Sequence, residues 1–263
     1  MSYEIIQGDC LEVMRGMADN SVDAIITDLP YGTTAIKWDT VIPLDAMWAC
    51  VKRVLKLGGV FVTTASQPFT TNLIASNMEW FKYEWIWQKP MSSGFLNAKN
   101  APLKAHENIV VFSSGAVAHV GKSELRMNYN PQMTSGKPYK KNDQVETKMK
   151  WGDIGRPSSA DYLTVNDGTR YPSSVLYFKN PNHNNEHPTQ KPVELYEYLI
   201  KTYTNIGGTV LDICMGSGTT GVAAMNTGRR FIGIERESEY VDLAQRRIEA
   251  ATAQLKIEEI DDK

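Results

Sequence analysis

The stretch VDAIIT, residues 22–27, is a short apolar run that stops abruptly, and it constrains the fold more than any other part of the chain. Directly after it stand a carboxylate, an apolar residue, a proline and a tyrosine, the sequence DLPY at residues 28–31. An apolar run of this length that is closed by a turn is typical of a buried strand. Open α/β sheets bind ligands at the carboxyl ends of their strands, so we expect residues 28–31 to lie in a site.

Short apolar runs of this kind alternate with segments of helical periodicity on both sides of an irregular middle. We expect strands at 4–7, 22–27, 60–64, 83–87, 108–112, 174–178, 209–214 and 230–235, and helices at 11–17, 44–55, 68–76, 193–203, 219–227 and 240–253. Gly58 and Gly59 are expected to end the helix at 44–55. The alternation predicts an α/β fold with a largely parallel sheet and crossover helices.

The middle of the chain, residues 113–184, lacks sustained periodicity and is rich in Pro, Gly, Asn, Lys and Tyr. An irregular stretch of this length is either functional or disordered, and its aromatic residues favour a small ordered module. We therefore divide the chain into an α/β part at 1–112, an insertion at 113–184, and a second α/β part at 185–263 that completes the same sheet.

The charge is unevenly distributed between these parts. The chain as a whole carries a net charge of −2, but residues 118–179 contain ten basic and six acidic residues, a net of +4 against −6 elsewhere. A basic module on an acidic body is a candidate footprint for nucleic acid. Charge alone supports a solvated surface insertion equally well.

Several protein classes are disfavoured by composition. No run approaches the ~20 consecutive apolar residues that span a membrane, and the N-terminus has no signal-peptide pattern. The three cysteines form no CxxC pair, so neither a metal site nor a disulfide framework is indicated. We expect a cytoplasmic protein with no membrane contact and no metal.

A glycine-rich loop, GSGTTG at residues 216–221, follows the expected strand at 209–214 and opens a helix. It matches G-x-G-x-x-G, and Glu235 ends the next strand, where it could bind ribose hydroxyls. Asp212 stands just before the loop, where a carboxylate would repel a pyrophosphate but would suit a cationic ammonium. The loop therefore favours S-adenosylmethionine over a nicotinamide dinucleotide, which stays open as an alternative.

The DLPY tetrapeptide suits a particular acceptor. An exocyclic amino group on a nucleobase is a poor nucleophile because its lone pair is delocalised into the ring, and it carries two N–H donors. The Asp28 carboxylate and the Leu29 carbonyl could accept both hydrogen bonds, with Pro30 stiffening the turn. Tyr31 offers a flat face on which an extruded base can stack.

Taken together, these motifs resemble the beta group of the amino-group DNA methyltransferases, which act on adenine N6 or cytosine N4. The resemblance rests on GD at 8–9, DLPY at 28–31 in place of DPPY, WQKP at 87–90, HENI at 106–109, HPTQKP at 187–192 and the cofactor motif formed by Asp212 and residues 216–220. It covers roughly residues 8–112 and 187–250. It implies a Rossmann-like methyltransferase fold with a circularly permuted, mostly parallel sheet, and a target-recognition module at 113–184.

The resemblance also assigns roles to residues. It implies that Asp28, Leu29, Pro30 and Tyr31 hold and activate the target base, and that S-adenosylmethionine is bound by Asp9, Asp28, Thr189, Lys191, Asp212, Gly216, Ser217, Gly218, Thr219, Thr220 and Glu235. Within that set, Asp9 would meet the adenine, Glu235 the ribose, and Thr189 and Lys191 the methionine carboxylate. For Lys191, a surface lysine before Pro192 is an equally weighted reading.

Two positions depart from the family pattern. Leu29 replaces a proline, which leaves the carbonyl acceptor but a less rigid turn, and Cys214 replaces a phenylalanine near the cofactor. An aspartate in the acceptor motif favours adenine N6 in double-stranded DNA, with cytosine N4 as the alternative. A catalytically silent DNA-binding relative, an RNA or protein-amide substrate, and a homodimer remain open.

Overall fold

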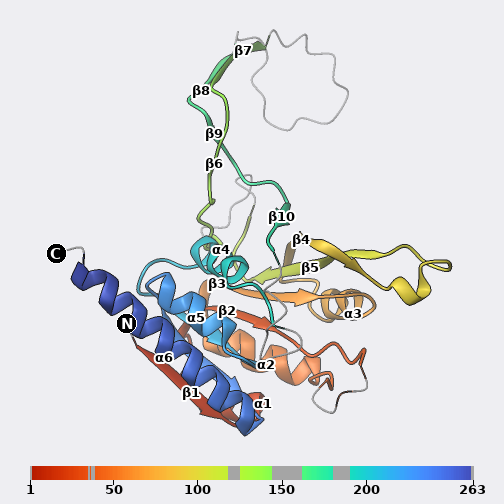
Figure 1. Ribbon diagram of the computed structural model, residues 1–263, viewed down its shortest axis with the longest axis vertical. Coiled ribbons are helices and arrows are strands. Elements are labelled where there is room, and N and C mark those ends of the chain that lie inside the picture. Colours follow the sequence, from red (N-terminus) through yellow and green to blue (C-terminus); the bar gives the residue numbers. More distant parts are fainter. Residues whose placement is uncertain are drawn as a thin grey trace. The chain divides into compact units, whose positions relative to one another are not determined.

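The computed structural model describes residues 2–34, 36, 39–117, 125–143, 162–179 and 190–261. The chain divides into two compact units, one formed by residues 1–130 and 174–263 and the other by residues 131–173. The first unit is an eight-stranded sheet covered by helices on both faces (Figure 1). The predicted α/β class and mostly parallel sheet are therefore confirmed.

The strands of the sheet follow the spatial order β1-β12-β11-β2-β3-β5-β4-β10. Their bounds are β1 Tyr3–Gln7, β2 Val22–Asp28, β3 Leu55–Ala65, β4 Phe81–Ser93, β5 Lys104–Ser113, β10 Val175–Tyr177, β11 Thr209–Asp212 and β12 Arg230–Glu235. The five strands from β1 to β3 are parallel neighbours, whereas β5 runs antiparallel to both β3 and β4. Because β11 pairs with β2 and β12 with β1, the two ends of the chain build one sheet.

Helices bury the two faces of the sheet in separate cores. Their bounds are α1 Cys10–Gly16, α2 Leu44–Val54, α3 Phe69–Ser76, the short 3-10 helix η1 Phe95–Asn97, α4 Val193–Tyr203, α5 Thr219–Asn226 and α6 Ser238–Asp261. Ala24 and Ile26 of β2 pack toward α4, α5 and α6, and the intervening Ile25 packs toward α1, α2 and α3. This alternation follows from the two-residue period of a strand, and it explains why the centre of β2, residues 24–26, is apolar on both faces.

The expected role of the glycine pair at 58–59 is wrong. The helix over 44–55 was expected to end at Gly58 and Gly59, but α2 ends at Val54 and both glycines lie inside β3. Gly58 adopts a left-handed backbone with φ of 75°, and a Cβ there would lie 2.5 Å from the Arg126 carbonyl oxygen. A Cβ on Gly59 would lie 2.9 Å from the Asp23 carbonyl oxygen of β2, so both glycines are required by close backbone approaches rather than by a helix end.

In its described residues, 131–143 and 162–173, the second unit forms two small antiparallel ladders. They are formed by β6 Thr134–Ser135 with β9 Thr169–Arg170, and by β7 Tyr139–Asp143 with β8 Tyr162–Asn166. Arg170 ties the ladders internally, since its guanidinium binds the Asn166 side chain and the Lys137 carbonyl and lies 4.8 Å over the Tyr139 ring. The domain boundaries at 113 and 184 stay a prediction.

Candidate active site

Three neighbouring strands end in a carboxylate at the same edge of the sheet. Asp28 is the last residue of β2, Asp212 of β11 and Glu235 of β12, and Asp9 follows β1. Because β1, β12, β11 and β2 are parallel neighbours, their carboxyl ends meet at one edge. The backbone therefore brings the four carboxylates to one edge of the sheet, and their roles toward a cofactor stay a prediction.

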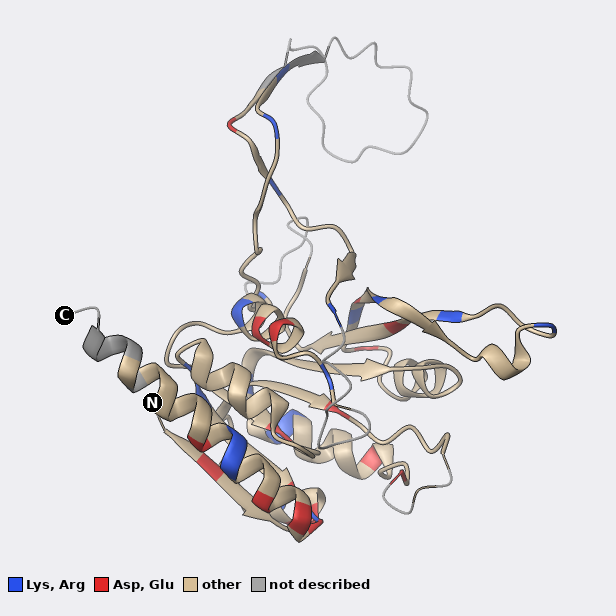
Figure 2. Ribbon diagram, in the orientation of Figure 1, with Lys and Arg blue, Asp and Glu red and all other residues tan. Residues whose placement is uncertain are grey.

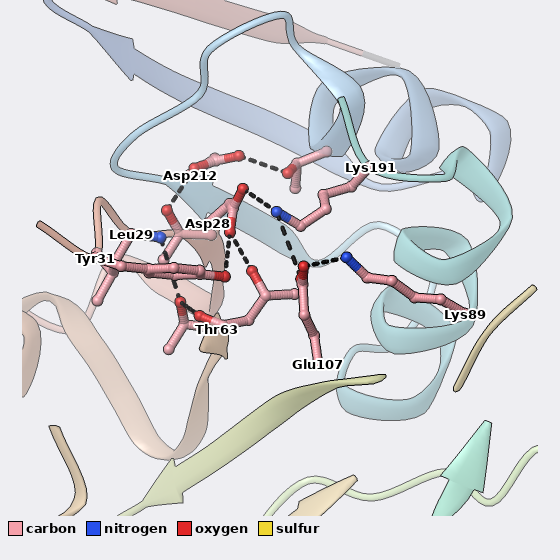
Figure 3. A network of polar contacts seen from close by, with 11 residues as sticks. Asp28, Leu29, Tyr31, Thr63, Lys89, Glu107, Lys191 and Asp212 are labelled. Carbon is pink, nitrogen blue, oxygen red and sulfur yellow. Dashed lines mark hydrogen bonds and ion pairs between the residues drawn. The ribbon is translucent and has the colours of Figure 1, made fainter. Parts of the chain in front are cut away.

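Asp28 lies at the centre of the polar contacts at this edge (Figure 3). One carboxylate oxygen accepts hydrogen bonds from the Tyr31 hydroxyl at 3.0 Å and from the Thr64 hydroxyl. The other oxygen lies 2.5 Å from the Lys191 ammonium. The carboxylate is thus held from three directions, and its side chain is 26% exposed, so one side remains open to the pocket.

A line of alternating charges continues from Asp28 into the protein. Lys191 also lies 3.7 Å from the Glu107 carboxylate, which binds the Lys89 ammonium. Burial acts to raise the pKa of Glu107, but Lys191 and then Lys89 outweigh it and hold that pKa below its ordinary value. Burial likewise acts to lower the pKa of Lys191, and Asp28 and Glu107 together raise it above its ordinary value. Lys191 is therefore a permanent cation beside the acceptor carboxylate.

The interpretation of Lys191 as a surface lysine is wrong, since its side chain is 11% exposed. Its ammonium faces two carboxylates, so a contact with the methionine carboxylate stays a prediction. Thr189 of the same motif lies outside the described residues.

The tyrosine of the acceptor motif is half-buried and has one face covered. The Tyr31 ring stacks on Phe69 with centroids 5.4 Å apart and planes 23° from parallel. Burial first, and then the charge of Asp28, raise the pKa of the Tyr31 hydroxyl well above its ordinary value, so this group stays a donor. Leu29 is buried in the core beneath, and its N–H lies 3.4 Å from the Thr63 hydroxyl. These contacts anchor the turn that lacks the family's proline.

The loop after the acceptor motif is organised by Asp39, which the sequence analysis missed. Its carboxylate accepts hydrogen bonds from the N–H groups of Gly32, Thr33 and Thr34 at 2.7 to 2.9 Å, and from the Thr34 hydroxyl. Burial acts to raise the pKa of Asp39, and these hydrogen bonds reverse the effect and lower it. Successive N–H groups that converge on one anion fix the loop that lines the pocket.

Asp212 is buried and surrounded by neutral donors. It accepts hydrogen bonds from the Thr27 hydroxyl at 2.7 Å, the Thr220 hydroxyl at 2.5 Å and the Cys214 N–H at 3.1 Å. Burial raises the pKa of this carboxyl to about 6, although the hydrogen bonds act against the shift. Asp212 therefore ties β2, β11 and α5 together, and its contact with the methionine ammonium stays a prediction.

The glycine loop turns from β11 into α5 through two left-handed residues. Gly216 has φ of 51° and Gly218 φ of 77°, and a Cβ on Gly218 would lie 2.8 Å from the Ala244 side chain. The Gly216 N–H donates to the Glu235 carboxylate at 2.8 Å, so the loop and the end of β12 are fixed together. From α6, Arg247 binds the Ser217 carbonyl and, at 2.9 Å, its hydroxyl.

Asp9 is the N-cap of α1. One oxygen of its carboxylate accepts hydrogen bonds from the Leu11 N–H at 2.9 Å and the Glu12 N–H at 3.2 Å. This capping places the carboxylate at the rim of the pocket, next to the strand pair β1 and β12. An adenine contact by Asp9 stays a prediction.

One pocket joins the acceptor end to the cofactor end. Its volume is about 230 Å³, several times the ~30 Å³ share of one water. It is lined by residues of both ends, among them Asp9, Asp28, Leu29, Pro30, Tyr31, Asp39, Lys191, Asp212, Gly216, Ser217, Thr219, Thr220 and Glu235. In the part of the chain that the structure describes, no group of His, Cys, Asp and Glu side chains could hold a metal ion, and no helix is long and apolar enough to cross a bilayer.

Sequence reasoning quoted the motifs that contain Lys89 and Glu107 but assigned neither residue a role. Residue type and spacing gave little indication of their role, because each charge is explained only by its oppositely charged partner on the neighbouring strand. Thr64 gave no signal at all, since it sits inside an apolar strand.

Comparison with known proteins defines the class. The family model described as DNA methylase, of the N6- and N4-specific group, matches residues 22–246, and the chain belongs to this family. The protein is thus an S-adenosylmethionine-dependent DNA amino-methyltransferase, acting on adenine N6 or cytosine N4. This excludes the dinucleotide reading of the glycine loop.

The chain is similar to several individual methyltransferases in sequence and in structure. The chain is 29% identical to the type II methyltransferase M.BglII of Bacillus subtilis over 92% of this chain and 67% of that protein. It is 26% identical to the type II methyltransferase M1.MboII of Moraxella bovis over 92% and 94%. Among solved structures, the M1.HpyAVI–SAM complex has a TM-score of 0.62 at 26% identity and covers 94% of this chain and 98% of that one. The cytosine-N4-specific PvuII methyltransferase has a TM-score of 0.64 at 18% identity, with 94% and 86% covered, a likeness of fold.

The described residues fit the cofactor of this family. S-adenosylmethionine carries a cationic sulfonium and ammonium, and the strand ends present four carboxylates to one pocket. The left-handed glycines let the backbone approach a ligand closely. S-adenosylmethionine supplies an electrophilic methyl group when it is bound.

Proposed function

We propose that this protein methylates the exocyclic N6 of adenine within a short target in duplex DNA, after the base has been flipped out of the helix. The observation that carries the proposal is the carboxylate of Asp28 at the mouth of the pocket that also contains the glycine loop and Glu235. In the family that the sequence resembles, an aspartate in this position is more often found with adenine than with cytosine.

The residues at the acceptor end act by positioning. Asp28 and the Leu29 carbonyl accept the two N–H bonds of the amino group, which draws its nitrogen toward a tetrahedral geometry and aims the lone pair at the methyl group. The Tyr31 hydroxyl now occupies one oxygen of Asp28, so the arriving amino group replaces that hydrogen bond. Phe69 covers one face of Tyr31, and the extruded base stacks on the other face.

Lys191 acts on Asp28 by direct contact, and Glu107 acts on Asp28 only through Lys191. Lys191 holds one carboxylate oxygen in place, and Glu107 offsets the added positive charge, which would otherwise oppose a cationic cofactor. The insertion at 113–184 supplies sequence recognition, with exposed basic side chains such as Lys137 and Lys140 on phosphates. Arg170 is excluded from that role because its guanidinium holds the second unit together.

The test is the identity of the methylated nucleoside. Unmethylated plasmid DNA is incubated with the protein and isotopically labelled S-adenosylmethionine, digested to nucleosides and analysed by mass spectrometry. The expected product is N6-methyldeoxyadenosine, and Asp28→Ala abolishes it whereas Asp45→Ala, an exposed aspartate on α2, does not. N4-methyldeoxycytidine as the product would show that the target base is cytosine, and would overturn the assignment to adenine. No incorporation alongside intact DNA binding would identify a catalytically silent relative.

A further inference from the structure

The hairpin formed by β4 and β5 projects beyond the sheet (Figure 1). Its regular pairing ends at Gln88 and His106 and resumes only at Ser93 and Lys104, after a register shift. At its far end the large apolar side chains are uncovered: Phe95 is 68% exposed and Leu96 is fully exposed. Neither side chain belongs to the apolar core of the sheet.

The tip is nevertheless a built structure. Gly94 takes a left-handed backbone, with φ of 92°, into the helix η1. The chain then closes on itself through the Asn97 N–H on the Gly94 carbonyl at 3.0 Å and the Ala98 N–H on the Phe95 carbonyl at 3.2 Å. Exposed apolar side chains on an ordered tip mark a contact surface.

The charge of the hairpin identifies the kind of partner. Residues 85–106 contain three lysines (Lys89, Lys99 and Lys104) and no Asp or Glu, within a chain of net charge −2. Figure 2 shows the blue segments along this hairpin, with red only toward its base. Two copies of this surface would repel each other, whereas a polyanion complements it.

The hairpin begins at the edge of the sheet that carries the candidate active site. At its base Lys89 binds Glu107, which lies beside Lys191, and Lys191 binds Asp28. The arm from Gln88 to Ser93 spans about 16 Å at ~3.3 Å per residue, which exceeds the ~8.5 Å depth of the major groove of DNA. A duplex that delivers a base to Asp28 therefore comes within reach of the tip.

We propose that Phe95 and Leu96 enter the duplex beside the flipped base as an apolar wedge, while Lys99 binds a flanking phosphate. Base flipping leaves a gap in the stack, and apolar side chains inserted between base steps stabilise such distorted DNA. The inference rests on duplex DNA as the substrate of this site, and it is independent of which base is methylated.

Two hairpin variants and two matched controls test this wedge. The variants are the double substitution Phe95→Ser with Leu96→Ser, and Lys99→Glu. The controls are Ile206→Ser, an apolar side chain 83% exposed in the loop after α4, and Arg15→Glu, an exposed cation at the end of α1. For each protein, methylation of unmethylated plasmid DNA, binding to a short labelled mixed-sequence duplex over a salt series, and calorimetric binding of S-adenosylmethionine are measured.

The wedge variant is expected to raise the KM for plasmid DNA roughly tenfold, with unchanged affinity for S-adenosylmethionine. Lys99→Glu is expected to reduce the salt slope of duplex binding by about 1 or more. Both controls should match the wild type in every measurement.

Wild-type KM, kcat and salt slope in both hairpin variants would overturn the proposal. So would wild-type methylation and duplex binding together with a changed oligomeric state in size-exclusion chromatography, because the tip would then join copies of the chain. Failure of the wild type to methylate DNA would overturn the proposed function alone, since duplex binding still reports on the hairpin.

Discussion

Asp28 and Asp212 end two neighbouring strands of one sheet, but the protein treats the two carboxylates differently. Asp28 faces a lysine ammonium, which is itself flanked by a second carboxylate. Asp212 is more deeply buried and has only hydroxyl and backbone N–H donors around it, so burial raises its pKa to about 6. The acceptor end is therefore built from charges, and the cofactor end from neutral dipoles that leave the ligand to bring the positive charge.

The largest effect on stability is expected when the cation is removed from the acceptor end. Lys191→Met leaves Asp28 and Glu107 close together without their shared counter-charge, so we expect a loss of about 3–5 kcal/mol in the free energy of unfolding. Urea unfolding at neutral pH measures it. The matched control is Lys201→Met, whose exposed ion pair with Glu197 contributes only about 0.3–0.5 kcal/mol. Equal losses of stability in the two variants would contradict the role of Lys191 as the counter-charge that Asp28 and Glu107 share.

The cofactor end is tested by pH. The folded pKa of Asp212 is raised above the ordinary 3.8, so the folded state binds the proton more tightly. The stability contributed by this group is therefore full below about pH 4 and is lost as the pH rises to about 6, a total of about 3 kcal/mol. Asp212→Asn preserves the shape and removes the titration, so the unfolding free energy of the wild type should rise relative to that of the variant as the pH falls from about 6 to about 4. Parallel pH profiles for the two proteins would show that burial does not perturb this carboxyl.

A pair of threonines sharpens the comparison, because each donates its hydroxyl to one of the two aspartates. Thr220→Val removes a donor from a carboxylate that has no cation, and we expect a loss of about 2 kcal/mol. Thr64→Val removes a donor from a carboxylate that keeps Lys191, and about 1 kcal/mol is expected. Denaturant unfolding of both variants gives the two values. A larger stability loss in Thr64→Val than in Thr220→Val would mean that Lys191 does not compensate Asp28 for the lost hydrogen bond.

Glu235 extends the comparison to a third strand end, where backbone N–H groups are the donors. It accepts from the N–H groups of Gly216, Arg236 and Glu237 at 2.8 to 3.0 Å. Glu235→Gln replaces one accepting oxygen by a donor, which loosens the loop and weakens the proposed ribose contact. We expect a roughly tenfold weaker Kd for S-adenosylmethionine by calorimetry, about 1.4 kcal/mol, with a smaller change in stability. An unchanged Kd would remove Glu235 from the cofactor site.

Local pattern was enough to predict most elements of the sheet and its helices. Runs such as residues 22–27 and 209–214 are short, apolar and closed by turn residues, and both are strands in the structure. Gly58 and Gly59 were wrongly predicted to end the helix at 44–55, because a glycine pair after a helix is a common stop signal. Gly58 meets the Arg126 backbone, 68 positions further along the chain, and Gly59 meets the Asp23 carbonyl on the neighbouring strand β2, and no local window contains either contact.

Residue types and short spacings were enough to predict the class of site. Carboxylates at strand ends, a glycine loop and the DLPY motif follow from residue type and short spacing, and parallel strands bring their carboxyl ends to one edge of any such sheet. Only the tertiary structure decided how those carboxylates are balanced. Lys191 and Asp28 stand 163 positions apart, and burial and counter-charge depend on which side chains the fold brings within a few ångströms of each other, a distance that the sequence does not encode locally.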